Sequence, residues 1–313
     1  AFGGDEDELT QTVSVMGTAS YFSPEPSLVV NDTTLEWPGA LYERCLLHAM
    51  TALNHIALNK WDGASVAARR ILKDLNPDFR KKYPDDAFSR YLAGFCLDVE
   101  GDPDNASIQY RKASDLVSRV DIDPQTGRMA FSGGEGPPQD RAEHELLCFV
   151  LLGRAPKGSV RTSDRFIGDP LYYAEIFDGD TRLGRSYTLT DTRALAAATE
   201  KIDAKVKAAR AAARIAIKES LAEAAAKESK SDEVGDLVRL VLIGMLEHPD
   251  FRRWETLPRW LQVIRVPCPP DLQNCRLVIR NSHGGKVKNT KLVNPITRHD
   301  STFVTFYRDA TVF

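Results

Sequence analysis

The chain has 313 residues, of which 42% are hydrophobic and 27% charged, and its formal net charge is −3. This length is enough to bury a core without metals or disulfides, and we expect two domains. The composition excludes wholesale disorder. The small negative charge gives no broad attraction for nucleic acid or for an anionic membrane, so we expect no nucleic-acid partner.

The lengths of the apolar runs and the composition of the first residues indicate where in the cell the protein is found. A membrane-spanning helix needs roughly 20 apolar residues, and the closest run, Leu237 to Leu246, is too short. The first residues, Ala1 to Glu8, are mostly small or acidic. Such a start is typical of signal-peptide cleavage, although an artificial boundary would look the same. We therefore expect an exported protein without a transmembrane segment.

Residues 1–37 are expected to form an extended N-terminal arm. Two β-prone runs, 10–17 and 27–31, are separated by Ser23-Pro-Glu-Pro. No partner strand lies nearby in the sequence. The arm must therefore pair with the C-terminal region or with another subunit, or stay mobile.

Residues 38–120 show apolar residues at steps of three and four, which predicts two helical hairpins. The same unit returns about 42 residues later, and helical repeats have periods of this length. In this alignment Ala64 matches Ala106, and Ala68 matches Tyr110. The period is the strongest structural signal in the chain and predicts a domain like a tetratricopeptide repeat (TPR).

The remainder predicts a second, mixed domain, so the fold class is α+β. Residues 121–141 are rich in glycine and proline and are expected to be a loop that separates the domains. The α+β domain would then span 142–313, with a long alanine-rich helix at 191–229. Its other expected elements are a buried strand (or part of a helix that begins near Gln139) at 145–153, an irregular or weakly stranded segment at 161–185, a helix at 233–248, and C-terminal strands at 260–266, 276–280 and 301–307.

The repeat region resembles an uncharacterised family of bacterial envelope proteins with tetratricopeptide-like repeats, many of which are lipoproteins. The residues that carry the resemblance are 39–54, Trp61-Asp-Gly-Ala, 83–94 and 104–113, with weaker support from Arg253-Trp254 and Leu257-Pro258. The resemblance implies a scaffold role, no catalytic residues, and a location in the periplasm, on the outer membrane surface or outside the cell. A lipidated member would begin at a cysteine, whereas the first cysteine here, Cys45, lies inside a predicted helix.

Helical repeats present a concave groove lined by their first helices. Tyr42, Asn54, Arg90 and Tyr91 fall on these helices and are the predicted protein-binding residues. We therefore expect a non-catalytic scaffold of the cell envelope that binds protein through this groove. The alternative is a subunit that assembles into a head-to-tail oligomer or an extracellular filament, with the N-terminal arm and the C-terminal strands as contacts.

Catalytic motifs are missing from the sequence: it contains no nucleophile elbow, zincin helix, P-loop or dinucleotide fingerprint. We therefore expect no enzyme activity, no cofactor and no metal. Cys45 and His48 share one helical face, but no further ligands cluster near them, so a packing role is the simpler interpretation.

Two of the five cysteines are disulfide candidates. Cys268 and Cys275 flank a short loop that contains two prolines. In an oxidising compartment a disulfide between the two cysteines could close this loop. Zinc is the rival interpretation, but it needs four ligands. Cys45, Cys96 and Cys148 lie in apolar segments, where a buried thiol is expected, and a bridge between Cys45 and Cys96 stays open.

Overall fold

The computed structural model describes residues 39–80, 83–155, 171–229, 233, 236–237, 254–272, 275–291 and 296–311. Contacts divide the chain into two compact units. The larger unit comprises 39–202 and 253–313, and the smaller comprises 1–38 and 203–252. The expected N-terminal arm at 1–37 and most of the expected helix at 233–248 lie outside the described residues.

Four helices of the larger unit form two hairpins. The helices are α3 (Leu41–Ala57) and α4 (Trp61–Asp74) in the first hairpin, and α6 (Ala87–Glu100) and α7 (Pro103–Leu116) in the second, with a short α5 (Pro77–Arg80) between them. The helices of each hairpin pack together, and α4 packs against α6. The predicted pair of hairpins is present.

Local side chains set the ends of the second hairpin's helices. Asp86 accepts a hydrogen bond of 3.1 Å from the backbone N–H of Ser89, which caps α6. Gly101 ends that helix with φ of +88°, a conformation that glycine adopts without strain. Asp102 caps α7, and Pro103 occupies its first position, where no backbone donor is needed.

The main sheet has five strands in the order β10–β11–β3–β7–β6. Their bounds are β3 (Glu145–Leu152), β6 (Tyr187–Asp191), β7 (Trp260–Pro267), β10 (Thr297–His299) and β11 (Thr302–Asp309). The central strand β3 is parallel to β11 and antiparallel to β7. The predicted strands at 145–153, 260–266 and 301–307 are confirmed as β3, β7 and β11.

A second sheet has the order β5–β4–β8–β9, with every pair antiparallel. Its strands are β4 (Tyr172–Asp178), β5 (Thr181–Arg185), β8 (Cys275–Asn281) and β9 (Lys286–Lys291). The predicted strand at 276–280 is confirmed as β8. The segment at 161–185, expected to be irregular or weakly stranded, contains in its described part the paired strands β4 and β5, with a shift of register between Ile176 and Phe177.

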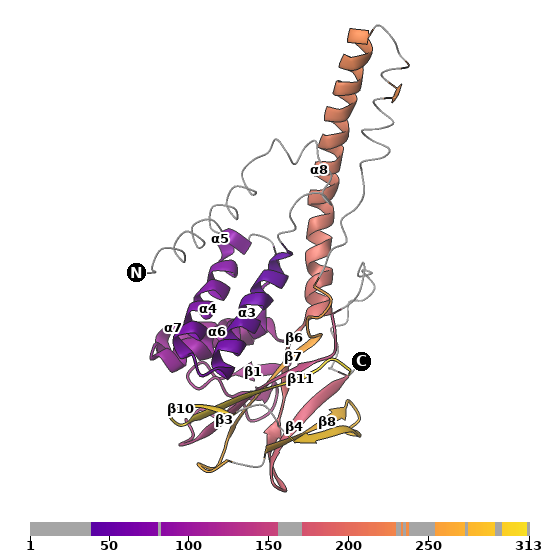
Figure 1. Cartoon of the computed structure of the whole chain (residues 1–313). Helices are drawn as coiled ribbons and strands as arrows, with labels where there is room; N and C mark the ends of the chain where they lie inside the picture. Colours follow the sequence, from indigo (N-terminus) through magenta and orange to yellow (C-terminus); the bar gives the residue numbers. More distant parts are fainter. Residues whose placement is uncertain are drawn as a thin grey trace, which may run out of the picture. The chain divides into compact units, whose positions relative to one another are not determined.

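β3, labelled in Figure 1, is buried on both faces and separates two hydrophobic cores. Leu147, Phe149 and Leu151 join the core beneath the helices, whereas Cys148 and Val150 face the second sheet. The larger unit thus has three layers: helices, main sheet and second sheet. Because neither face of β3 meets water, its sequence is a continuous apolar run.

The helices and the main sheet share one core, which corrects the predicted division into domains at 38–120 and 142–313. The ring of Phe149 on β3 lies 5.8 Å from that of Phe88 and 6.2 Å from that of Phe95, both on α6. The physical reason is burial: the apolar side of the hairpins lies against the sheet and would otherwise face water.

The predicted loop at 121–141 contains a short hairpin of β1 (Val120–Ile122) and β2 (Met129–Phe131). The Asp123 carboxylate closes its turn by accepting hydrogen bonds from the backbone N–H groups of Gln125, at 3.0 Å, and Thr126, at 2.7 Å. Glycine and proline marked the turn correctly, but the flanking strands are too short for an alternating pattern to show.

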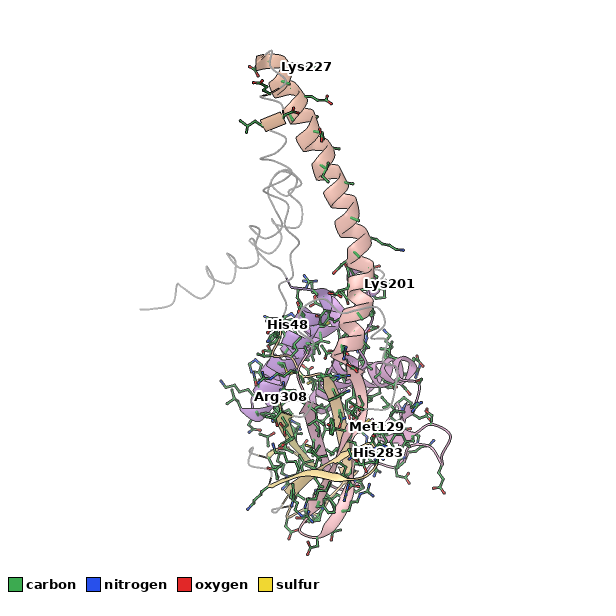
Figure 2. The ribbon with its side chains drawn as sticks, turned by 90° about the vertical axis from the view of Figure 1, so that its right-hand side faces the viewer. His48, Met129, Lys201, Lys227, His283 and Arg308 are labelled. Atoms are coloured by element: carbon green, nitrogen blue, oxygen red, sulfur yellow. The ribbon has the colours of Figure 1, made fainter. Side chains whose placement is uncertain are left out.

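The predicted helix at 191–229 is present as α8 (Thr192–Ser229), on which Figure 2 labels Lys201 and Lys227. Asp191 accepts a hydrogen bond of 2.9 Å from the Arg193 backbone at its start. The helix belongs to the larger unit as far as Ile202. Among the described helices, none has the length and apolar character needed to cross a membrane.

Candidate interaction surface

Three of the four predicted groove residues are buried. The exposed fraction is 8% for Tyr42, 3% for Arg90 and 0% for Tyr91, and only Asn54 is exposed. The reason is that the first helices of both hairpins face the main sheet: α3 contacts β11, and α6 contacts β6. The protein's own sheet therefore occupies the side where a groove was predicted, and the prediction that Arg90 and Tyr91 line an open surface is wrong.

Arg90 instead links three elements of the helical layer. Its Nε donates to Asp85 at 3.0 Å, its Nη1 to Gln109 on α7 at 2.9 Å, and its Nη2 to the carbonyl of Leu75 at 2.7 Å. These bonds satisfy the guanidinium within the protein, so its role in this fold is structural.

Tyr91 has a similar internal role. Its hydroxyl donates to the Gly127 carbonyl at 2.7 Å, and its ring lies 5.2 Å from the ring of Tyr110. Burial raises the pKa of Tyr91 to about 12. The phenol therefore stays protonated and connects α6 to the β1–β2 turn.

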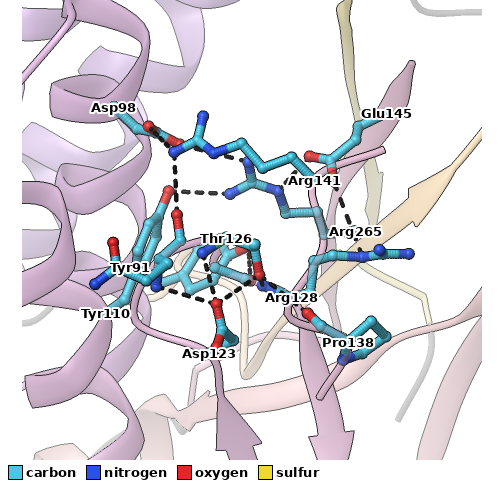
Figure 3. Close-up of polar contacts among 12 residues, drawn as sticks. Tyr91, Asp98, Tyr110, Asp123, Thr126, Arg128, Pro138, Arg141, Glu145 and Arg265 are labelled. Atoms are coloured by element: carbon cyan, nitrogen blue, oxygen red, sulfur yellow. Dashed lines mark hydrogen bonds and ion pairs between the residues drawn. The ribbon is translucent and has the colours of Figure 1, made fainter. Parts of the chain in front are cut away.

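A buried polar network at the interface of helices and sheet centres on Arg265 of β7 (Figure 3). Its Nε donates to Glu145 on β3 at 2.8 Å, and its Nη1 donates to the Tyr110 hydroxyl at 3.0 Å. Its Nη2 lies 3.5 Å from Asp98 on α6, which also accepts a bond of 2.7 Å from Arg141. Opposite charges are thus paired inside the protein, as buried charges require.

A small cleft of about 160 Å³ adjoins this network. Its lining includes Asp98, Arg141, Glu145 and Arg265 together with the turn residues 299–302. Oε1 of Glu145 is buried without a hydrogen-bond partner in the described ranges, and Arg128 Nε lies 3.9 Å from it. The charged groups of the cleft therefore hold one another by ion pairs.

The five cysteines are free thiols. The predicted disulfide between Cys268 and Cys275 is therefore not formed in this structure. Burial raises the pKa of Cys96 and Cys268 to about 12 and of Cys275 to about 11. Burial also raises the pKa of Cys45 and Cys148. Protonated thiols are poor nucleophiles and poor metal ligands.

A metal site near Cys45 and His48 has no support in the described ranges, where no group of three metal-binding side chains comes together. His48 Nε2 lies 3.8 Å from Asp74 on α4. Desolvation lowers the pKa of His48, although Asp74 opposes this shift. The histidine therefore belongs to the packing between α3 and α4.

The second helices of the hairpins carry equivalent exposed residues. Val66 on α4 is 46% exposed, and Ile108 on α7 is 41% exposed. Two exposed cations follow each of them at the third and fourth positions, which lie on the same helical side. We call this set the outer helical face; it consists of Val66, Arg69 and Arg70 on α4, and Ile108, Arg111 and Lys112 on α7. The sequence carries this signal at the 42-residue period, but the predicted binding residues all lie on the first helices.

A second charged surface lies on the outward side of the second sheet. Ala174, Ile176 and Leu277 point from this sheet into the core, so the residues between them in β4 and β8 point outward. The outward positions are rich in arginine and lysine. We call Arg182, Arg185, Arg276, Arg280, Lys286 and Lys291 the cationic sheet face.

Comparison with protein-family models, with curated proteins and with solved structures finds no match to this chain.

Proposed function

We propose that this protein is a non-catalytic scaffold of the bacterial cell envelope, located outside the cytoplasm, which binds other protein through a TPR-like pair of hairpins. The location rests on the resemblance of residues 39–113 to envelope proteins. The binding surface in this proposal is the outer helical face, because the first helices are covered by the sheet.

One observation carries the proposal: the same exposed pattern occurs twice, on two helices that are equivalent in the repeat. Val66 and Ile108 are large apolar residues that remain in contact with water. Single exposed apolar residues are common, but a binding surface that spans two repeats would place them at equivalent positions of both, as here.

The neighbouring cations indicate the chemistry of the partner. Arg69 forms an ion pair with Glu100 on α6, and Arg70, Arg111 and Lys112 are exposed. Apolar side chains beside cations suit a partner helix that has an apolar stripe and acidic flanks. A scaffold role is also compatible with the ion-paired cleft and the protonated thiols described above.

A crosslinking experiment tests the proposal. A photoreactive residue placed at Val66 and, in a second variant, at Ile108 should crosslink to the same envelope protein, because the proposal assigns both positions to one binding surface. Ile215 on α8 is 40% exposed and serves as the matched control position.

We expect the shared adduct from both helices and its loss when Arg70 and Arg111 are changed to glutamate. Adducts that differ between Val66 and Ile108, or that appear equally from Ile215, would contradict the proposed surface.

A further inference from the structure

The outward side of the second sheet carries a cross-strand row of cations around an aromatic ring. Phe177 on β4 lies directly opposite Arg182 on β5 and Arg276 on β8, and Arg276 lies opposite Lys291 on β9. Directly opposite residues point to the same side of a sheet. All four strands therefore contribute to this row.

A second row lies further along the strands. Tyr173 on β4 is opposite Arg280 on β8, which is opposite Lys286 on β9. Arg185 lies over the Tyr173 ring, with its guanidinium carbon 4.0 Å from the ring centre. Both rows thus combine one aromatic ring with several cations.

Positive charge is in excess on this surface. The cationic sheet face has six cations. Glu175, between the two rows, pairs with Arg182 at 2.9 Å and also with Arg280, and Asp180 pairs with Arg276 at 3.6 Å. The whole chain, in contrast, has a net charge of −3. This local excess predicts an anionic partner.

The aromatic rings hold two of the arginines in position. The guanidinium carbon of Arg276 is 4.3 Å from the centre of the Phe177 ring, an arrangement like that of Arg185 over Tyr173. Arg276 also donates from Nε to the Gly179 carbonyl at 3.0 Å and lies 3.6 Å from Asp180, which fixes it further. A stacked guanidinium leaves its remaining outer N–H groups available for carboxylate oxygens. Less side-chain freedom is then lost when a carboxylate binds.

β9 forms an edge of the same sheet. Among the described strands it pairs only with β8, and all its residues except Thr290 are exposed. An edge strand has backbone N–H and C=O groups that can pair with an added strand. Recognition by strand addition uses such an edge.

We infer that β9 and the cationic sheet face bind an extended acidic segment of a partner protein, which adds as a strand beside β9. Alternate residues of a strand point to one side, about 7 Å apart. Carboxylates at alternate positions would therefore lie on the same side as Lys286 and Lys291, while the backbone pairs with the edge.

A second copy of β9 is the less suitable occupant. It would bring its own lysines beside Lys286 and Lys291, and like charges across a strand pair are destabilising. Lysine on an edge strand opposes such pairing between identical chains. The inference concerns a different surface from the outer helical face, so the two can fail separately.

A labelled peptide of alternating glutamate and threonine tests the inference with the full-length protein. We expect saturable binding, measured by fluorescence anisotropy, that weakens as salt is added. The same peptide with alternate backbone nitrogens methylated should bind roughly tenfold more weakly or not at all, because it cannot form strand hydrogen bonds.

The protein variant with Lys286→Glu and Lys291→Glu should lose roughly tenfold or more in affinity for the acidic peptide. The matched control is Lys201→Glu on α8, where the lysine is also exposed, and its affinity should not change. Far-UV circular dichroism checks that both variants fold.

Three results would overturn the inference. The first is that the acidic peptide does not bind. The second is that the methylated peptide binds equally well, which would leave only non-specific charge attraction. The third is that a single-stranded oligonucleotide binds more tightly than the peptide and depends on the same lysines, which would identify a phosphate polymer as the partner.

Discussion

The guanidinium of Arg265 on β7 donates a hydrogen bond of 3.0 Å to the hydroxyl of Tyr110 on α7. The two residues are 155 positions apart in the chain, and both are buried. A buried donor or acceptor that loses its partner has no water to replace it. The helical layer and the main sheet therefore depend on each other at this point for polar contacts as well as for apolar packing.

Replacement of Arg265 tests this dependence. Arg265→Met would remove the buried cation between Asp98 and Glu145 and leave them only Arg141 and the more distant Arg128, so the free energy of unfolding should fall by about 3 to 5 kcal/mol. Urea denaturation measures the change. Arg69→Met is the control: its partner Glu100 is partly exposed, and loss of such a pair should cost at most about 1 kcal/mol. Equal losses in the two variants would contradict a stabilising role for the buried network.

Two glycines with positive φ allow a matched comparison. A Cβ at Gly127 would lie 2.5 Å from Nη1 of Arg265 and 2.7 Å from the Tyr110 ring, whereas a Cβ at Gly133 would have no atom within 4 Å. Gly133→Ala should cost about 1 to 2 kcal/mol for backbone strain alone. Gly127→Ala should cost a further ~1 to 3 kcal/mol for the clash. Thermal and urea unfolding measure the loss of stability in each variant. Similar losses in the two variants would contradict close packing at Gly127.

Acid sensitivity should depend on Asp309. Burial favours its protonated form, but hydrogen bonds from Lys288 and Thr311 outweigh burial and lower the pKa of Asp309 below its ordinary value of 3.8. The folded state therefore holds fewer protons than the unfolded state in this acidic range. Its stabilising contribution is complete above the ordinary value and is lost as pH falls toward the folded pKa.

Asp309→Asn should make the decrease in the free energy of unfolding below pH of about 4 less steep, as measured by urea unfolding at several pH values. Lys288→Met should have a similar effect, because Lys288 donates the bond of 2.6 Å that keeps Asp309 ionised. If the free energy of unfolding falls with pH equally steeply in both variants and in the parent protein, this pair does not control acid stability.

The hairpins, the central strand and α8 could be predicted because their signals are local. Helical spacing, the caps Asp86 and Asp102, and the apolar run of β3 all lie within a few residues of what they determine. β5 and β9 were missed because they lie at the edges of the second sheet, where half-exposed positions weaken the alternating pattern.

The groove residues and the polar network show the limit of local patterns. The spacing that placed Arg90 and Tyr91 on a first helix says nothing about which element covers that helix, and here a sheet from later in the chain covers it. Arg265 and Glu145 are 120 positions apart, so no motif connects them. The repeated exposed pattern of α4 and α7 was available in the sequence, but its exposure depended on the position of the sheet.

The disulfide between Cys268 and Cys275 remains a prediction for oxidising conditions. Burial raises the pKa of Cys268 to about 12 and that of Cys275 to about 11, so few thiolates exist at neutral pH. Uncatalysed oxidation should therefore be slow, because the thiolate is the reacting form. Oxidation in a glutathione buffer with a disulfide isomerase should yield one internal bond, identified by peptide mapping without reduction.

The control for this bond is Cys268→Ser, which should leave the remaining four thiols free after the same treatment. Cys45, Cys96 and Cys148 are buried in the cores, and access of an oxidant to them requires opening of the fold. A bond between Cys45 and Cys96 in the folded protein, or no bond after catalysed oxidation, would contradict the prediction. Since the two candidates flank only the short loop 269–274, the bond should raise the free energy of unfolding by about 2 to 3 kcal/mol.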